Sequence, residues 1–134
     1  MHILLVSEDD QIRGPMARVL GQAFCNELDV KHVVFESAGS KVQGSMQSFD
    51  EVISFMAGRQ LNIKKHLTSS ISFQMVRRAD MIMCMTHDIA KEVKTMIGAP
   101  HDAKVVVLNK AVGFGTTRTK QDITAVLQLD EQTL

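Results

Sequence analysis

Hydrophobic residues in this chain fall into four short, nearly continuous runs, separated by longer stretches where they recur at helical spacing. Apolar runs of this length, flanked by polar residues, are typical of strands buried on both faces of a parallel sheet. The predicted strands are residues 2–6, 31–35, 80–85 and 104–108.

The stretches between these runs predict helices. The first covers residues 15–28, and Pro15 suits its first turn because the missing N–H has no partner to lose there. The side chains expected on its buried face are Met16, Val19, Leu20, Ala23 and Phe24. Further helices are predicted at residues 45–58, 69–78 and 87–97, with a short amphipathic tail at 122–129.

Strands that alternate with helices predict the α/β class: a three-layer sandwich in which helices cover both faces of a four-stranded parallel sheet. At 134 residues, the chain is expected to form a single domain over residues 1–134. Ligands of such sheets bind beyond the carboxyl ends of the strands, so the loop after the first strand is the first place to look for a site.

Net charge and composition limit the kinds of binding partner that the sequence predicts. The formal net charge is zero, which gives no electrostatic signature for nucleic acid or an anionic membrane surface. No apolar run approaches the roughly 20 residues that span a bilayer, and no signal-peptide pattern opens the chain. Cys25 and Cys84 fall inside predicted elements, which favours buried free thiols in a cytoplasmic protein.

The polar segment between the first strand and the first helix predicts an anion-binding loop, because backbone N–H groups at a helix N-terminus attract anions. Its residues are Ser7, Glu8, Asp9, Asp10, Gln11, Ile12, Arg13 and Gly14. The spacing from Ser7 to Arg13 is that of the C-x5-R signature, in which a thiolate attacks phosphorus and the arginine binds two phosphoryl oxygens. Here a serine stands at the thiolate position.

Four segments in order resemble the low-molecular-weight protein tyrosine phosphatase family, which includes bacterial arginine phosphatases and is related to one class of arsenate reductases. They are VSEDDQIRGPMA at residues 6–17, SAG at 37–39, HLTS at 66–69 and RADMIMCMTH at 78–87. The resemblance implies the family's fold and a phosphate-binding loop with Arg13 as the phosphate ligand.

The departures from the family pattern predict lost activity. Ser7 replaces the nucleophilic cysteine, and a serine hydroxyl stays un-ionised near neutral pH without an adjacent base. Asp9 and Asp10 occupy the family's glycine and asparagine positions, and together with Glu8 they are expected to repel a phosphate dianion. Gly14 replaces a serine that would stabilise the thiolate.

Ala125 and Val126 stand where the family's general-acid Asp-Pro pair is expected, with Asp122 close by as a possible substitute acid. The resulting interpretation is a regulatory or binding pseudophosphatase. A residual phosphatase that uses Arg13 is the alternative.

Several roles stay open at this level. Arg13 either binds an oxyanion or pairs with Asp9 or Asp10 and closes the pocket. The three acids form a solvated loop, a plug paired with Arg13, or a divalent-cation site. His66 is expected to form structural hydrogen bonds, and His87 to lie at a helix start.

A degenerate response-regulator receiver is a second alternative, because ILLVSEDDQIR also resembles the opening of that family. Its phosphoryl-accepting aspartate would then be replaced by Ser54, while Thr86 and Lys110 fit loosely.

The expected partner is a protein. Few residues follow Asp122, whereas family members are expected to end in a long helix packed on the sheet. An uncovered apolar face predicts a homodimer or docking on another protein, such as a phosphorylated one. The histidines lack the spacing of metal ligands, so neither a metal nor a cofactor is expected.

Overall fold

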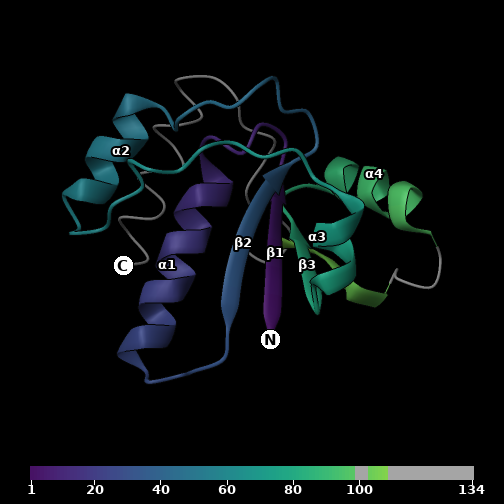
Figure 1. Cartoon of the computed structure of the whole chain (residues 1–134), viewed down its shortest axis with the longest axis horizontal. Helices are drawn as coiled ribbons and strands as arrows, with labels where there is room; N and C mark the ends of the chain where they lie inside the picture. Colours follow the sequence, from purple (N-terminus) through teal and green to yellow (C-terminus); the bar gives the residue numbers. More distant parts are fainter. Residues whose placement is uncertain (99–102, 109–134) are drawn as a thin grey trace.

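The computed structural model describes residues 1–98 and 103–108. Its elements follow one another as β1 (His2–Ser7), α1 (Arg13–Glu27), β2 (Val34–Gly39), α2 (Asp50–Ala57), α3 (Phe73–Arg78), β3 (Met81–Cys84), α4 (His87–Ile97) and β4 (Val105–Val107). The four strands form one parallel sheet in the order β2-β1-β3-β4 (Figure 1). The predicted tail at 122–129 lies outside the described residues.

Helices lie on both sides of this sheet. Figure 1 shows α1 and α2 on one side and α3 and α4 on the other. Leu4 and Val6 of the central strand β1 are fully buried, and Leu5 between them is only 3% exposed. Alternate residues of a strand point to opposite faces, so burial of all three requires cover on both faces. The predicted α/β sandwich is confirmed.

Two apolar clusters hold the layers together. The larger one joins the sheet to α3 and α4, with Ile82 of β3 and Ile89 of α4 among its members. The smaller one lies between α1 and α2 and consists of Ile12, Met16, Val52, Met56 and Ile63. The second cluster packs the first turn of α1 against α2, and so anchors the helix that begins at the predicted anion-binding loop.

The second strand begins three residues later than predicted and extends to Gly39. Its register pairs His2 with Val34 and Ser7 with Gly39. His32 has a φ of 67°, a left-handed conformation that cannot continue a strand. The small and polar residues SAGS at 37–40 also predict a turn after the second strand. That prediction is wrong for Ser37, Ala38 and Gly39, which belong to β2.

Three helices also start elsewhere than predicted. α1 begins at Arg13, two residues early, while α2 begins at Asp50 rather than at 45. α3 begins at Phe73 rather than at 69, because the Ser72 side chain caps it by accepting the Met75 N–H. The fourth helix matches its predicted bounds and ends at Ile97, before Gly98, whose φ is 80°.

The buried face of α1 is shorter than predicted. A side chain at Gly21 would meet the ring of Phe35, near the start of β2, at 2.7 Å, so the helix lies directly on the sheet there. Phe24, one turn later, is 62% exposed, and Cys25 is only partly buried. The expected burial of these two side chains was wrong because the sheet ends beside Gly21.

Candidate active site

The predicted anion-binding loop connects the carboxyl end of β1 to the first turn of α1. In the strand order, β1 and β3 are the neighbours at which the chain reverses its direction of progress across the sheet. Crevices at such a point are the usual ligand sites of parallel sheets. The loop lies at the end of the molecule to which the β1 and β2 arrows point in Figure 1.

Main-chain hydrogen bonds fasten this loop to its neighbours. Ser40 N–H donates to Ser7 O at 3.0 Å, and Lys41 N–H donates to Glu8 O at 2.8 Å. A Cβ at Gly39 would come within 2.7 Å of Glu8 O, a contact that real Cβ atoms do not make. Glycine at the end of β2 therefore allows the loop to lie directly against that strand.

Asp10 is the structural centre of the loop. Its φ of 59° places it in the left-handed region, which Asp and Asn tolerate better than most residues. Its N–H donates to Ser7 Oγ at 3.0 Å, and its carbonyl lies 2.8 Å from Nε2 of His66. Its carboxylate accepts the Ser69 N–H at 3.0 Å. The prediction that His66 forms structural hydrogen bonds is confirmed.

The Asp10 carboxyl is fully buried, and this burial raises its pKa above the usual value. Neighbouring Ser37, the Ser69 N–H, His66 and Arg18 oppose the shift without cancelling it. The second carboxylate oxygen, Oδ1, has no hydrogen-bond partner among the described residues. A solvated acidic loop is therefore wrong for Asp10.

Glu8 and Asp9 differ from Asp10, because both side chains are only partly buried. Asp9 Oδ1 accepts the Gln11 N–H at 3.1 Å, a local turn that fixes the middle of the loop. Of the three acids expected to repel an anion together, one is therefore held inside the fold by protein hydrogen bonds. Arg13 is the first residue of α1 and is 6% exposed.

Ser7, Asp10 and Gly14 form a close group. Ser7 is 3% exposed. A Cβ at Gly14 would lie 2.9 Å from Asp10 Oδ1 and 3.2 Å from Ser7 Oγ. The two oxygens thus converge on the backbone of Gly14, where a larger residue would displace the carboxylate.

Residues of β3 and α4 complete the surroundings. Thr86 is buried and caps α4 by accepting the Ile89 N–H at 3.2 Å, and His87 follows at the helix start with an exposed side chain, as expected. Cys84 is fully buried, which raises the pKa of its thiol to about 12 and leaves it unreactive.

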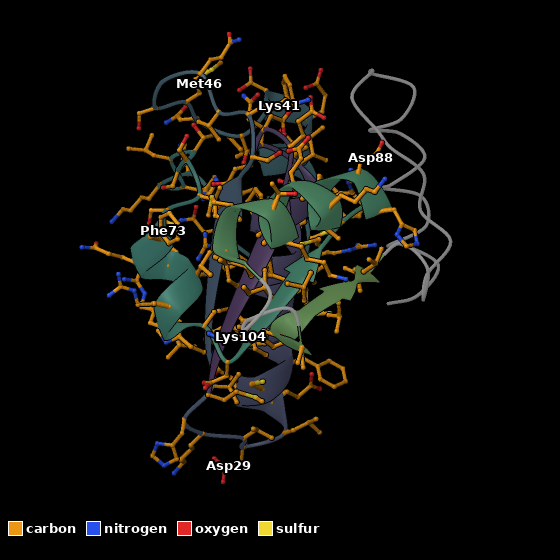
Figure 2. All side chains as sticks on the ribbon, turned by 90° about the vertical axis from the view of Figure 1, so that its right-hand side faces the viewer. Asp29, Lys41, Met46, Phe73, Asp88 and Lys104 are labelled. Carbon is orange, nitrogen blue, oxygen red and sulfur yellow. The ribbon has the colours of Figure 1, made fainter. Side chains whose placement is uncertain are left out.

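A cavity of about 520 Å³ adjoins the loop. Its lining residues are Glu8, Lys41, Thr86, Asp88, Ile89, Lys91 and Glu92. Lys41 Nζ and Glu92 Oε1 lie 3.7 Å apart across it, and Figure 2 shows Lys41 and Asp88 at the same end of the molecule.

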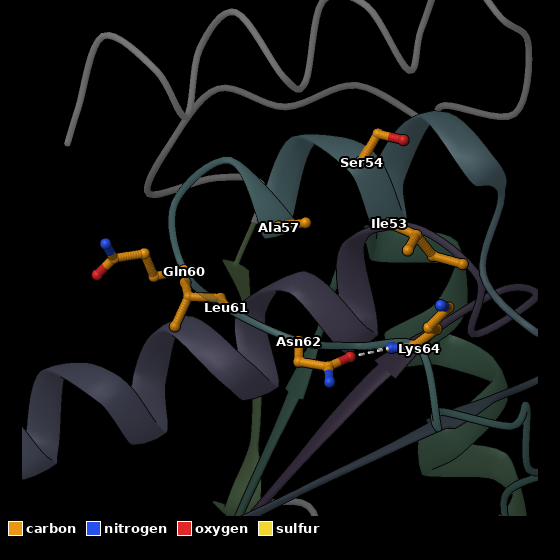
Figure 3. Close-up of a pocket in the computed structure, with 7 residues that line it drawn as sticks. All are labelled: Ile53, Ser54, Ala57, Gln60, Leu61, Asn62 and Lys64. Atoms are coloured by element: carbon orange, nitrogen blue, oxygen red, sulfur yellow. Dashed lines mark hydrogen bonds between the residues drawn. The ribbon is translucent and has the colours of Figure 1, made fainter.

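A separate hollow of about 500 Å³ lies beside α2 (Figure 3). It is lined by Ile53, Ser54, Ala57, Gln60, Leu61, Asn62 and Lys64. Asn62 Oδ1 accepts the Lys64 N–H within its wall. Lys64 is the one ionisable residue among these lining residues. The hollow is therefore poorly suited to acid–base chemistry.

Some predicted features cannot be compared with the structure. Lys110, Asp122, Ala125 and Val126 lie outside the described residues. Within residues 1–98 and 103–108, no group of three or more His, Cys, Asp or Glu side chains could hold a metal ion. No helix in that part of the chain is long and apolar enough to cross a membrane.

Sequence reasoning missed the parts of the site supplied by backbone groups. Ser69 contributes its N–H, and Lys41 donates its N–H to the loop, yet neither identity predicts such a role. The HLTS segment could have indicated this contact with the loop, since it contains both His66 and Ser69, the two residues that bind Asp10.

The fold and this loop together define a phosphatase-like α/β protein. The sequence profile of the low molecular weight phosphotyrosine protein phosphatase family matches residues 2–131, and the chain belongs to that family. No curated protein sequence matches the chain. The receiver interpretation is therefore wrong, and Ser54, its expected acceptor position, lies inside α2 rather than at a strand end.

Solved structures share the fold. A YwlE mutant from Bacillus subtilis has a TM-score of 0.78 at 19% identity, with 99% of this chain and 95% of that chain covered. A Cys-to-Ser mutant of YwlE arginine phosphatase, with a phosphorylated active-site serine, has a TM-score of 0.78 at 20% sequence identity. The match covers 99% of this chain and 93% of that chain. A protein tyrosine phosphatase has a TM-score of 0.77 at 26% sequence identity, with 98% of this chain and 88% of that chain covered.

Proposed function

We propose that this chain is a pseudophosphatase that binds phosphorylated protein ligands at the loop from Ser7 to Gly14 without sustained hydrolysis. The observation that carries the proposal is the hydroxyl of Ser7 at the end of β1, where the family's signature has a thiolate. A serine hydroxyl is much less acidic than a thiol, so it is both a weaker nucleophile near neutral pH and a poorer leaving group.

The surroundings of Ser7 support ligand retention. Arg13 is kept at the position from which the family's arginine binds two phosphoryl oxygens. The loop opens a helix of 15 residues, whose N-terminal N–H groups favour an anion. The phosphorylated serine of the YwlE mutant supports the idea that such a loop accommodates a phosphoryl group on a serine oxygen.

The ligand class follows from the relatives, which are described as tyrosine and arginine phosphatases. We infer a protein that carries phosphotyrosine or phosphoarginine. We also propose that the chain binds a second copy of itself. Sedimentation of the purified protein over a concentration series measures this self-association.

An NMR titration with phosphate and then vanadate, at constant ionic strength, tests binding at the loop. The expected result is saturable shifts of the amides from Ser7 to Gly14. Arg13→Ala removes these shifts, whereas Arg77→Ala, which changes an exposed arginine of α3, leaves them in place. An absence of shifts up to tens of millimolar would contradict phosphate binding.

A residual phosphohydrolase is the second candidate, favoured by the retention of Arg13 six residues after Ser7, at the start of α1. Assay with p-nitrophenyl phosphate separates the two. Sustained turnover that Arg13→Ala abolishes would establish that the chain is a hydrolase and would contradict its proposed role as a pseudophosphatase.

A further inference from the structure

The carboxyl of Asp10 lies at the same helix end as the proposed anion site. Its Oδ1 is 2.9 Å from the position that a Cβ on Gly14, the second residue of α1, would occupy. Asp10 is fully buried, so solvent screens its charge poorly. When it is ionised, a negative charge therefore lies inside the fold at the helix N-terminus whose N–H groups favour an anion.

The imidazole of His66 packs against Asp10 and is only 5% exposed. Its Nε2 lies 2.8 Å from the Asp10 carbonyl oxygen and 3.5 Å from Oδ2. A carbonyl oxygen only accepts hydrogen bonds, so Nε2 carries a hydrogen. Arg18 is the other charged group that faces Asp10 among the described residues, and it keeps its charge at acid and neutral pH. Two groups here are therefore able to take up a proton: the Asp10 carboxyl and Nδ1 of His66.

Burial favours the protonated form of the Asp10 carboxyl. Desolvation raises the pKa of Asp10 above its usual value, although the Ser37 side chain and the Ser69 N–H favour the ionised form. An oxyanion bound at the same helix end adds a second negative charge, and like charges raise the pKa of a carboxyl further. Anion binding and protonation of Asp10 therefore favour each other, and by linkage each strengthens the other by the same factor.

We propose that oxyanion binding at the loop from Ser7 to Gly14 is coupled to protonation of Asp10, so that the chain takes up a proton together with its phosphorylated ligand. This inference rests on the proposed function and names the regulation of that site. Affinity is greatest at pH values below the pKa of Asp10 in the free protein. It falls as the pH rises from that value to the higher pKa of the complex, and is constant above it.

Sulfate is the probe for this coupling, because it keeps two negative charges over a pH range in which phosphate itself titrates. NMR titrations between about pH 4.5 and pH 8, at constant ionic strength, follow the amides of the loop. The dissociation constant of sulfate is expected to increase by about 5-fold or more across this range. Calorimetry in buffers of different ionisation enthalpy is expected to show proton uptake on binding where the affinity changes with pH.

Asp10→Asn keeps the shape of the side chain and removes the group that titrates. This variant is expected to bind sulfate without the proton uptake, and more tightly than the wild type at the high end of the pH range. Asp50→Asn removes a carboxylate of the same charge from an exposed position in the first turn of α2. It is expected to keep the pH dependence of the wild type.

The carbon-13 resonance of the Asp10 carboxyl separates a proton on this group from a proton on His66. At a pH where the affinity is changing, sulfate is expected to move this resonance toward its protonated position and to leave the imidazole resonances of His66 in place. His66→Gln, which removes the imidazole, is expected to retain the pH dependence. The carbon-13 measurement uses the wild-type protein, so it decides the site of the proton even where loss of the imidazole disturbs the loop.

The outcomes separate this coupling from the proposed binding function. Sulfate binding with a pH dependence and proton uptake that persist in Asp10→Asn would overturn the coupling and leave binding at the loop standing. Sulfate-induced protonation of His66 in place of Asp10 would also overturn it. An absence of sulfate shifts at every pH, in both the wild type and Asp10→Asn, would contradict the binding function itself.

Discussion

At the scale of residues, the loop is organised around a buried acid. Asp10 uses its N–H, its carbonyl and one carboxylate oxygen to join Ser7, His66 and Ser69. The family has an asparagine at this position, which offers similar hydrogen bonds without a charge. Aspartate at this position is less favourable than asparagine when it is ionised, because burial disfavours the charged carboxylate.

Asp10→Asn is therefore expected to stabilise the protein at neutral pH. The pKa of Asp10 is raised in the fold, so its contribution to stability is complete below the usual carboxyl range and is lost as the pH rises through the folded value. The asparagine variant is therefore expected to be more stable than the wild type near pH 7. The difference is expected to vanish at acid pH, where Asp10 is protonated in both the folded and the unfolded protein. Thermal melts across this range measure it, with Asp50→Asn as the control that shows no gain.

Ser7→Cys tests whether the nucleophile alone was lost. Activity toward p-nitrophenyl phosphate is expected to stay low, because Glu8 and Asp9 remain in the loop and Gly14 offers no hydroxyl to stabilise the thiolate. Recovery of sustained turnover from this single change would show that the acids repel phosphate less than expected.

At the scale of elements, the carboxyl end of β2 shapes the site as much as the loop itself. The segment after Gly39 donates two N–H groups to the carbonyls of Ser7 and Glu8. Gly39 also accepts the Ile71 N–H and donates to Ser69 O, so one residue connects β2 to the segment that holds Asp10. Glycine is needed here for space, since the neighbouring backbone lies where a side chain would begin.

Gly39→Ala is expected to lower the free energy of unfolding by about 1–3 kcal/mol, because the new methyl group meets Glu8 O at 2.7 Å. The same change weakens the phosphate-induced shifts of the loop amides. Gly58→Ala is the control: its φ is −62°, and the nearest atom to its new Cβ lies at 3.4 Å. Urea denaturation of both variants measures the difference, and an equal effect would contradict the packing argument.

At the scale of the whole molecule, the sheet divides the core into two parts. The cluster under α3 and α4 includes most of the buried strand residues. The cluster between α1 and α2 is smaller, yet it includes Ile12 of the loop and Met16 of the first helix. Loss of packing in the smaller cluster is therefore transmitted to the site.

Met56→Ala is expected to destabilise the protein by about 2–5 kcal/mol, because Met56 is fully buried in the smaller cluster. Met46→Ala is the matched control, since Met46 is 49% exposed and its loss costs less than about 0.5 kcal/mol. Chemical denaturation of the two variants compares them. Similar midpoints would show that α2 contributes little to the cooperative fold.

The sequence by itself determined the class of fold and the family, and it indicated the place of the candidate site. Periodicity is a local property, so four apolar runs and the helical stretches between them predicted the layers, and α4 was predicted to the residue. The spacing from Ser7 to Arg13 likewise marked the loop.

Only the tertiary structure decided what each acid does and where β2 ends. Asp9 and Asp10 are adjacent and chemically identical, yet one is partly buried and the other fully buried. The difference depends on Ser37, His66 and Ser69, which lie far along the chain and reach Asp10 only in the fold. The strand end depends on its pairing with β1. Contacts between distant segments leave no local pattern, so the sequence did not predict them.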